Sequence, residues 1–86
     1  MYQIIISKKV EKFLDQLNNV EYKRILNRIE KLQENPMHYL ELKGDTWVEK
    51  AGRSGYRIAV EIKEQEKIVE IIFIQKRSKF YEQFNV

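Results

Sequence analysis

The 86-residue sequence contains no cysteine and a single histidine, His38. Without cysteine the chain has no disulfide framework and no thiolate metal site, and its composition fits a reducing cytoplasm. Because no second histidine or acidic cluster accompanies His38, we expect this residue at the surface and not in a metal site. The longest apolar run, Ile71 to Ile74, is far too short to cross a bilayer, and the N-terminus returns to polar residues after three isoleucines. The sequence therefore predicts no signal peptide and no membrane span.

The sequence also has little excess of charge, and that excess is unevenly placed. Residues 1–42 carry seven Lys and Arg against six Asp and Glu, residues 43–81 carry nine against six, and Glu82 brings the total to +3. Such an excess permits weak attraction to a polyanion, but many other soluble proteins share it. Net charge alone does not identify a partner.

The pattern of apolar residues predicts one α+β domain spanning residues 1–86, because chains divide only well above this size. Residues 2–6 are rich in β-branched side chains and predict a strand. Ser7 and Asn18 are suited to cap two successive helices, and Pro36 is expected to close the second. The apolar stripes of these helices are Val10, Phe13, Leu14 and Leu17, then Tyr22, Ile25, Leu26, Ile29 and Leu32. Two such helices predict a hairpin laid on a sheet.

The second half of the chain predicts an antiparallel β meander. Its strands cover residues 40–42, 46–50, 56–63 and 67–75, and residues 77–83 form a short terminal helix or coil. The register that keeps one side apolar pairs Ile62 with Val69, Val60 with Ile71 and Ile58 with Phe73. The opposite, mixed face then holds Arg57, Ala59, Glu61, Ile72 and Ile74. Strict alternation would send Arg77 away from Arg57 unless the last strand bends or ends by Lys76, and we expect a bend.

Basic side chains gather at two places in this meander. Lys50, Arg53 and Arg57 surround a Gly-containing bend, and Lys76-Arg77 ends the last strand, with Tyr81 just beyond. Pairing of the two strands would bring these cations to one end of the sheet. Cations with an aromatic ring and almost no histidine suit the binding or cleavage of a phosphodiester.

Several features, in this order, resemble the RelE-like toxins of the RelE/ParE toxin–antitoxin superfamily over nearly the full length of the chain. They are the opening strand, the helical hairpin ending in Glu-Asn-Pro, the Leu42-Lys43-Gly44 turn, Gly55-Tyr56-Arg57 at the start of a long strand, and Lys76-Arg77 followed by Tyr81. The resemblance implies a RelE-like, microbial-RNase-like sheet with helices on one face and a short C-terminal helix.

The resemblance also implies an activity and partners. It implies a cytoplasmic, ribosome-dependent endoribonuclease that cuts A-site codons by metal-independent attack of the 2′-hydroxyl, without a cofactor, and that is neutralised by a RelB-like antitoxin. The catalytic residues carried over are Lys50, Arg57, Arg77 and Tyr81, and those expected to bind RNA are Lys43, Arg53, Lys76 and Lys79. Val48 stands where the best-known members have a second lysine, a charge that Arg53 would supply.

The chemistry of these residues agrees with a slow nuclease. Arginine keeps its proton at any usable pH, so Arg57 and Arg77 would clamp phosphate oxygens. Neighbouring cations lower the pKa of a lysine, which would let Lys50 act as the base. Tyr81 would stack on a nucleobase and orient the attack. Because good acid–base groups are scarce, the ribosome is expected to complete the geometry.

Structural roles for the same residues remain open. Lys50 would be a solvated edge lysine, Arg77 and Lys79 solubilising charges, and Arg57 the partner of Glu61 or Glu70. The spacing of Phe80, Tyr81 and Phe84 suits an apolar anchor for the C-terminus, and Trp47 suits packing.

Two other functions also remain open. One is a ParE-type toxin that inhibits gyrase, against which Lys50 and Tyr81 argue. The other is a catalytically weak antitoxin-binding module, which Val48 supports.

Overall fold

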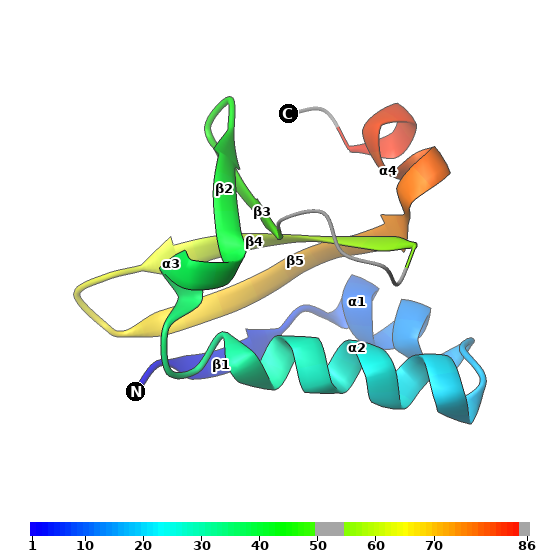
Figure 1. The fold of residues 1–86 in the computed structure, drawn as a ribbon, viewed down its shortest axis with the longest axis horizontal. Coiled ribbons are helices and arrows are strands. Elements are labelled where there is room, and N and C mark those ends of the chain that lie inside the picture. The colour runs from blue at the N-terminus through cyan, green and yellow to red at the C-terminus, as the bar shows by residue number, and fades with distance from the viewer. Residues whose placement is uncertain (50–54, 85–86) are drawn as a thin grey trace.

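The computed structural model describes residues 1–49 and 55–84, which form a five-stranded sheet with helices on both of its faces (Figure 1). The elements in these ranges are β1 (Gln3–Ile6), α1 (Lys8–Asp15), α2 (Asn19–Lys31), α3 (Pro36–Tyr39), β2 (Leu40–Lys43), β3 (Thr46–Glu49), β4 (Tyr56–Lys63), β5 (Ile68–Lys76) and α4 (Arg77–Gln83). The strand order is β1-β5-β4-β3-β2, with β1 parallel to β5 and the other neighbours antiparallel. The predicted α+β architecture is confirmed.

The helical hairpin begins where the sequence predicted it. The hydroxyl of Ser7 accepts a hydrogen bond from the Val10 amide at 3.3 Å, and Asn18 Oδ1 accepts one from the Glu21 amide at 2.9 Å. Each side chain satisfies an amide that has no partner inside the first turn of its helix. Both predicted caps are therefore confirmed.

The predicted role of Pro36 is wrong. Helix α2 already ends at Lys31, with Leu32 as its C-cap, and Pro36 instead begins the short helix α3. Proline suits the first position of a helix because the missing N–H needs no partner there and its backbone angle is already helical. The residue thus starts an element that the sequence did not predict, between the hairpin and β2.

The sheet carries a different apolar cluster on each face. The larger cluster lies between the sheet and the α1–α2 hairpin; its buried members are Val10, Leu14, Ile25, Ile29, Leu32, Leu40, Ile58, Val60, Val69, Ile71 and Ile74. The smaller one consists of Val48, Ala59, Phe73 and Phe80, with Ile72 and Phe84 packed against it. Figure 1 shows α4 on the side of the sheet opposite to α1 and α2. The C-terminal helix therefore covers the face that the hairpin leaves open.

A β-bulge interrupts the ladder between β4 and β5. The pairs Ile62–Val69 and Val60–Ile71 form as predicted. Ala59 then pairs with Phe73, so that Ile72 is an extra residue without a counterpart on β4. Because a bulge shifts the side-chain alternation by one position, every residue of β5 after Ile72 faces the side opposite to the one that strict alternation assigns.

This shift corrects two predictions from the sequence. Ile58 pairs with Ile74 and not with Phe73, and Ile74 is buried under the helical hairpin and not on the mixed face. Phe73 instead packs on the far face against Phe80 and Phe84, with ring centroids 5.5 Å and 5.0 Å away. The physical reason is that both faces of β5 need apolar side chains here, since a helix covers each of them.

No helix within the described ranges has the length and apolar character needed to cross a membrane.

Candidate functional site

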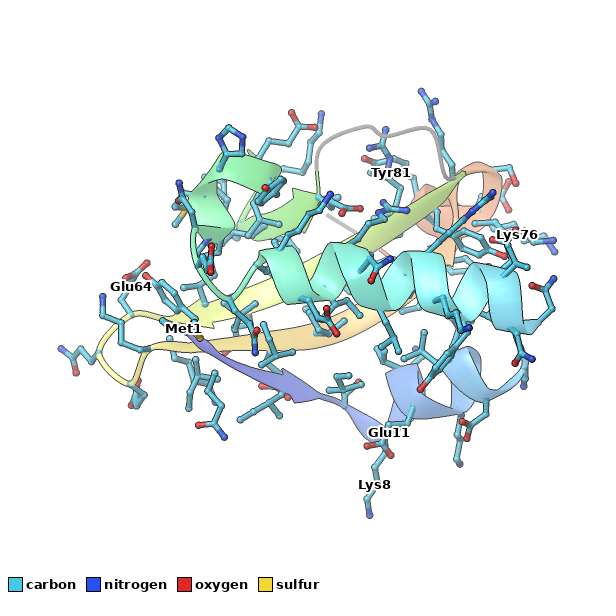
Figure 2. The ribbon with its side chains drawn as sticks, turned by 60° about the horizontal axis from the view of Figure 1, so that its bottom comes forward. Met1, Lys8, Glu11, Glu64, Lys76 and Tyr81 are labelled. Carbon is cyan, nitrogen blue, oxygen red and sulfur yellow. The ribbon has the colours of Figure 1, made fainter. Side chains whose placement is uncertain are left out.

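The open end of the β4–β5 hairpin brings together residues that lie about twenty positions apart in the sequence. Tyr56 pairs with Lys76, and the Arg77 amide donates a hydrogen bond to the Gly55 carbonyl at 2.7 Å. Gly55 has a φ of +77°, in the region that side chains disfavour. A Cβ there would meet no atom within 4 Å, so the backbone angle and not the space selects glycine. Figure 2 places Lys76 at the end of the molecule opposite to Met1 and Glu64.

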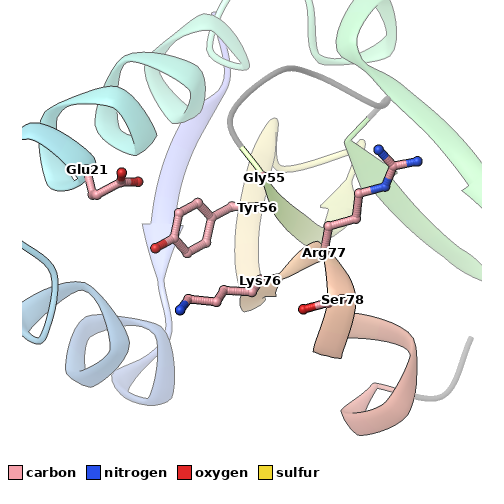
Figure 3. Close-up of a pocket in the computed structure, with 6 residues that line it drawn as sticks. All are labelled: Glu21, Gly55, Tyr56, Lys76, Arg77 and Ser78. Carbon is pink, nitrogen blue, oxygen red and sulfur yellow. The ribbon is translucent and has the colours of Figure 1, made fainter.

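The bulge in β5 places Arg77 on the same face as Arg57. Arg57 pairs with Gln75, and Arg77 follows Gln75 by two positions. Diagonal neighbours of this kind on paired strands have Cα atoms roughly 7–8 Å apart. Figure 3 agrees: Lys76 extends toward the helical hairpin, whereas Arg77 extends the opposite way. β5 ends at Lys76, one residue beyond the predicted Gln75, so α4 begins with Arg77.

Arg57 is buried, with 7% of its surface exposed, and not on a partly wet face as the sequence suggested. Its Nη1 donates to the Glu49 carbonyl at 3.2 Å, and its Nε has no hydrogen-bond partner among the described residues. The predicted pairing with Glu61 or Glu70 is not what holds this guanidinium, since Glu70 lies 3.8 Å from Lys63 instead. Because Nε of Arg57 is itself buried, it is an unsatisfied donor inside the protein, which costs stability.

A buried ion pair between Arg28 and Glu49 lies beside Arg57, and the sequence reasoning missed it. Arg28 Nε donates to Glu49 Oε2 at 2.9 Å, and its Nη2 donates to the Tyr56 carbonyl at 3.1 Å. Burial, and then the charge of Arg57, lower the pKa of Arg28. A signal was present: Arg28 follows Ile25 by three positions, within the apolar stripe of α2. A cation at such a position requires a buried partner.

An open cleft with a volume of about 620 Å³ lies at this end of the sheet (Figure 3). Its lining residues are Glu21, Gly55, Tyr56, Lys76, Arg77 and Ser78. Lys76 and Arg77 are exposed, and no carboxylate of the described residues forms an ion pair with either. The cleft therefore offers two cations that remain available for an anionic ligand.

Helix α4 holds two further predicted site residues at its surface. Lys79 is exposed, and Tyr81 is 47% exposed with its ring edge-on to Phe80 at 5.0 Å. Phe80 and Phe84 supply the apolar anchor, so Tyr81 is not needed for packing. Tyr81 is thus accessible to a ligand, while its role as a stacking residue stays a prediction.

The remaining predicted residues are not part of this cluster. Lys43 is the last residue of β2 and pairs with Thr46 beside the turn between β2 and β3. This turn lies at the end of the β2–β3 hairpin that is remote from Arg57. The Nζ of Lys43 lies 3.5 Å from Glu41 Oε1. Lys50 and Arg53 lie outside the described residues. Val48, at the position of the missing second lysine, is fully buried beneath α4, where a charge would be strongly disfavoured.

His38 and Trp47 are placed as the sequence predicted. His38 is exposed and stacks edge-on with Tyr39, and Trp47 packs against the larger core cluster. Among residues 1–49 and 55–84, no group of three or more His, Asp or Glu side chains is placed to hold a metal ion.

Solved structures similar to this chain include the RelE toxin alone and complexes of RelE with RelB. The match to the archaeal RelE–RelB complex from Pyrococcus horikoshii OT3 has a sequence identity of 25% and a TM-score of 0.73. It covers 91% of this chain and 97% of the matched chain. The isolated Escherichia coli RelE toxin gives 22% identity, coverage of 96% and 94%, and a TM-score of 0.75. The match to the intact Escherichia coli RelBE complex has a sequence identity of 20% and a TM-score of 0.75, and it covers 88% of this chain and 96% of the matched chain. No protein-family profile and no curated protein matches the chain.

Proposed function

We propose that this chain, which has the RelE fold and resembles RelE toxins, is the toxin of a type II toxin–antitoxin module. Two of the similar structures are complexes of RelE with RelB, which supports a RelB-like antitoxin as the partner of this chain. The reaction proposed is cleavage of messenger RNA in the ribosomal A site, in the cytoplasm.

The observation that carries the proposal is the arrangement of Arg57, Lys76 and Arg77 at one end of the sheet. Cleavage by a 2′-hydroxyl requires stabilisation of the negative charge that develops on the phosphorane. The guanidinium of Arg57, which the Glu49 carbonyl orients through Nη1, and the exposed guanidinium of Arg77 would supply the positive charge that one phosphate needs. Neither arginine would act as a base, because both stay protonated.

Proton transfer falls to other residues in this proposal. Lys50, which lies outside the described residues, would be the base, and Tyr81 would stack on a nucleobase next to the scissile bond. With few groups that titrate near neutral pH, the protein would cleave free RNA slowly. Programmed ribosomes would supply the missing alignment of the 2′-hydroxyl with its phosphate.

Toeprinting on translating ribosomes tests this proposal. We expect purified protein to cut messenger RNA at defined A-site codons, and to cut the same RNA far more slowly without ribosomes. Arg77→Ala should lower the cleavage rate about 10²-fold, as loss of one charge-stabilising donor typically does. Lys31→Ala is the matched control, because Lys31 is an exposed cation in the last turn of α2, and it should change the rate less than about threefold.

The other outcomes identify the alternatives. Inhibition of gyrase supercoiling without any cut in the RNA would assign the chain to the ParE type. Binding of an antitoxin without either activity would leave a catalytically weak binding module. Equal cleavage of free and ribosome-bound RNA would contradict the dependence on the ribosome.

A further inference from the structure

The cleft at the open end of the β4–β5 hairpin has lining residues beyond the cations of the proposed phosphate chemistry. Besides Lys76 and Arg77, the lining includes Tyr56 and Glu21. Tyr56, Lys76 and Glu21 also line an adjoining hollow of about 310 Å³ next to the helical hairpin. Pockets of such volumes accommodate small organic ligands the size of a nucleotide.

Tyr56 is held in place before any ligand arrives. Its ring forms a T-shaped contact with the Phe13 ring, with a centroid distance of 6.0 Å and an interplanar angle of 75°. Its backbone pairs with Lys76, and its carbonyl accepts a hydrogen bond from Arg28 Nη2. An aromatic ring that is already ordered loses little conformational entropy when a nucleobase packs on it, which favours binding.

Two consecutive cations point to opposite sides of this cleft. Figure 3 shows Lys76 extending alongside Tyr56 toward the helices, whereas Arg77 extends toward the other face of the sheet. A single small anion would be gripped by cations that converge. Cations that diverge from adjacent positions suit a chain that carries a phosphate at each side, as RNA does.

Glu21 is the one carboxylate among the six residues that line the cleft. It repels a phosphate from its end of the cleft, and it accepts hydrogen bonds but donates none when ionised. Within the described residues it forms no ion pair with Lys76 or any other cation. The complementary ligand group is the exocyclic amino group of a base, since a carboxylate accepts from cytosine N4 but faces only an acceptor at uracil O4.

We propose that this cleft is a nucleobase subsite for the nucleotide next to the phosphate held by Arg57 and Arg77. Tyr56 packs against the base, Lys76 contacts the neighbouring phosphate, and Glu21 selects a base with an amino group over uracil. The assignment rests on the proposed ribonuclease function, and it adds the residues that determine its sequence preference.

Cleavage on ribosomes with matched messages, in which cytosine replaces uracil at one A-site position at a time, tests the selection. At one position the wild-type protein should cut the cytosine message at least about fivefold faster, the lower end of what a specific base contact contributes. Glu21→Gln should remove most of this preference, because an amide both donates and accepts. The control, Glu30→Gln, changes an exposed carboxylate of the same helix and should keep the preference. An unchanged preference in Glu21→Gln, or none in the wild type, would overturn the proposal.

A binding measurement separates this inference from the proposed function. Amide shifts of the free protein titrated with cytidine and uridine monophosphates should move at Gly55, Tyr56 and Lys76, and more so with cytidine. Loss of that difference in Glu21→Gln would support the subsite even if no RNA were cleaved. If RNA is cleaved but neither nucleotide moves these amides, the subsite is wrong while the nuclease stands. Shifts caused only by an acidic peptide would show that the cleft binds a protein partner.

Discussion

Among the basic residues that the structure describes, Arg57 is the buried one, with 7% of its surface exposed. One of its nitrogens donates to the Glu49 carbonyl, and Nε has no partner among the described residues. The contact with Glu49 orients the guanidinium, while the unpaired Nε lies buried inside the protein. A planar group with donors in a fixed fork can keep one contact with the protein and still direct its charge toward a ligand, whereas an ammonium group lacks this fixed geometry.

Arg57→Lys tests this difference while it retains the positive charge. We expect the cleavage rate to fall by about 10-fold to 10²-fold because the fork is lost. Stability should fall by only about 1 kcal/mol, the usual net contribution of one hydrogen bond. Single-turnover cleavage and urea unfolding measure the two effects. Arg24→Lys, on the exposed side of α2, is the control. A variant as active as the wild type would show that charge alone suffices.

At the scale of the elements, the bulge at Ile72 determines which cations share a face. Before the bulge, β5 alternates in step with the larger core, and after it the alternation is reversed. As a result Ile74 and Lys76 face the helical hairpin, while Phe73 and Gln75 face α4. With all residues of β5 present, Arg77 lies on the face of Arg57 because the bulge takes one residue out of the alternation.

Two deletions in β5 test separately whether cleavage requires the bulge itself or the faces on which Lys76 and Arg77 lie. Deletion of Ile72 joins Ile71 to Phe73 in a regular ladder and leaves every other side chain on its present face. We expect this variant to fold and to keep cleavage within about tenfold of the wild type. Deletion of Gln75 exchanges the faces of Lys76 and Arg77, and should reduce cleavage by about 10²-fold or more, as misplacement of a catalytic group does.

Thermal melts followed by circular dichroism show whether each variant is folded, so that a loss of activity can be separated from a loss of the fold. If a folded Gln75 deletion variant cleaves as well as the Ile72 deletion variant, the shared face of Arg57 and Arg77 is not required.

At the scale of the whole molecule, a buried ion pair ties the helical hairpin to the sheet. Arg28 of α2 contacts Glu49 of β3 and the Tyr56 carbonyl of β4, so that one side chain connects a helix to two strands. These contacts flank both ends of the segment that contains Lys50 and Arg53. They therefore fix Glu49 at the end of β3 and Tyr56 at the start of β4.

Removal of one partner of this pair should destabilise the protein more than removal of both. Arg28→Met leaves the Glu49 carboxylate buried and unpaired, which typically costs about 3–5 kcal/mol. The double variant Arg28→Met, Glu49→Leu removes that unpaired charge and should recover part of the loss. Urea unfolding of the wild type, the two single variants and the double variant measures the coupling. A double variant as unstable as the sum of the single variants would contradict this account.

Local sequence signals predicted the elements well, because their causes are local. Ser7 and Asn18 cap helices through contacts three residues away, and the apolar stripes follow from helical spacing. The start of β4 at Tyr56 followed from local composition in the same way, whereas β5 ends one residue beyond the predicted Gln75.

The sequence predicted the structure less well where the same residues are compatible with two different local structures. Pro36 both ends and begins helices, and the sequence could not decide between them. The run from Ile71 to Ile74 is apolar throughout, so it carries no alternation from which the bulge could be recognised. Arg28 gave a signal, a cation in an apolar stripe, but nothing in the sequence specified its partner.

The sequence by itself determined the order of the elements, the caps, and the clustering of basic residues beside β4 and β5, since each depends on neighbours along the chain. Only the tertiary structure decided which of those residues share a face, which are buried, and that Arg28, Glu49 and Arg57 meet. The physical reason is that helices pack on both faces of β5. Apolar contacts on two sides select a bulged register, and that register, not the order of residues, orients the arginines.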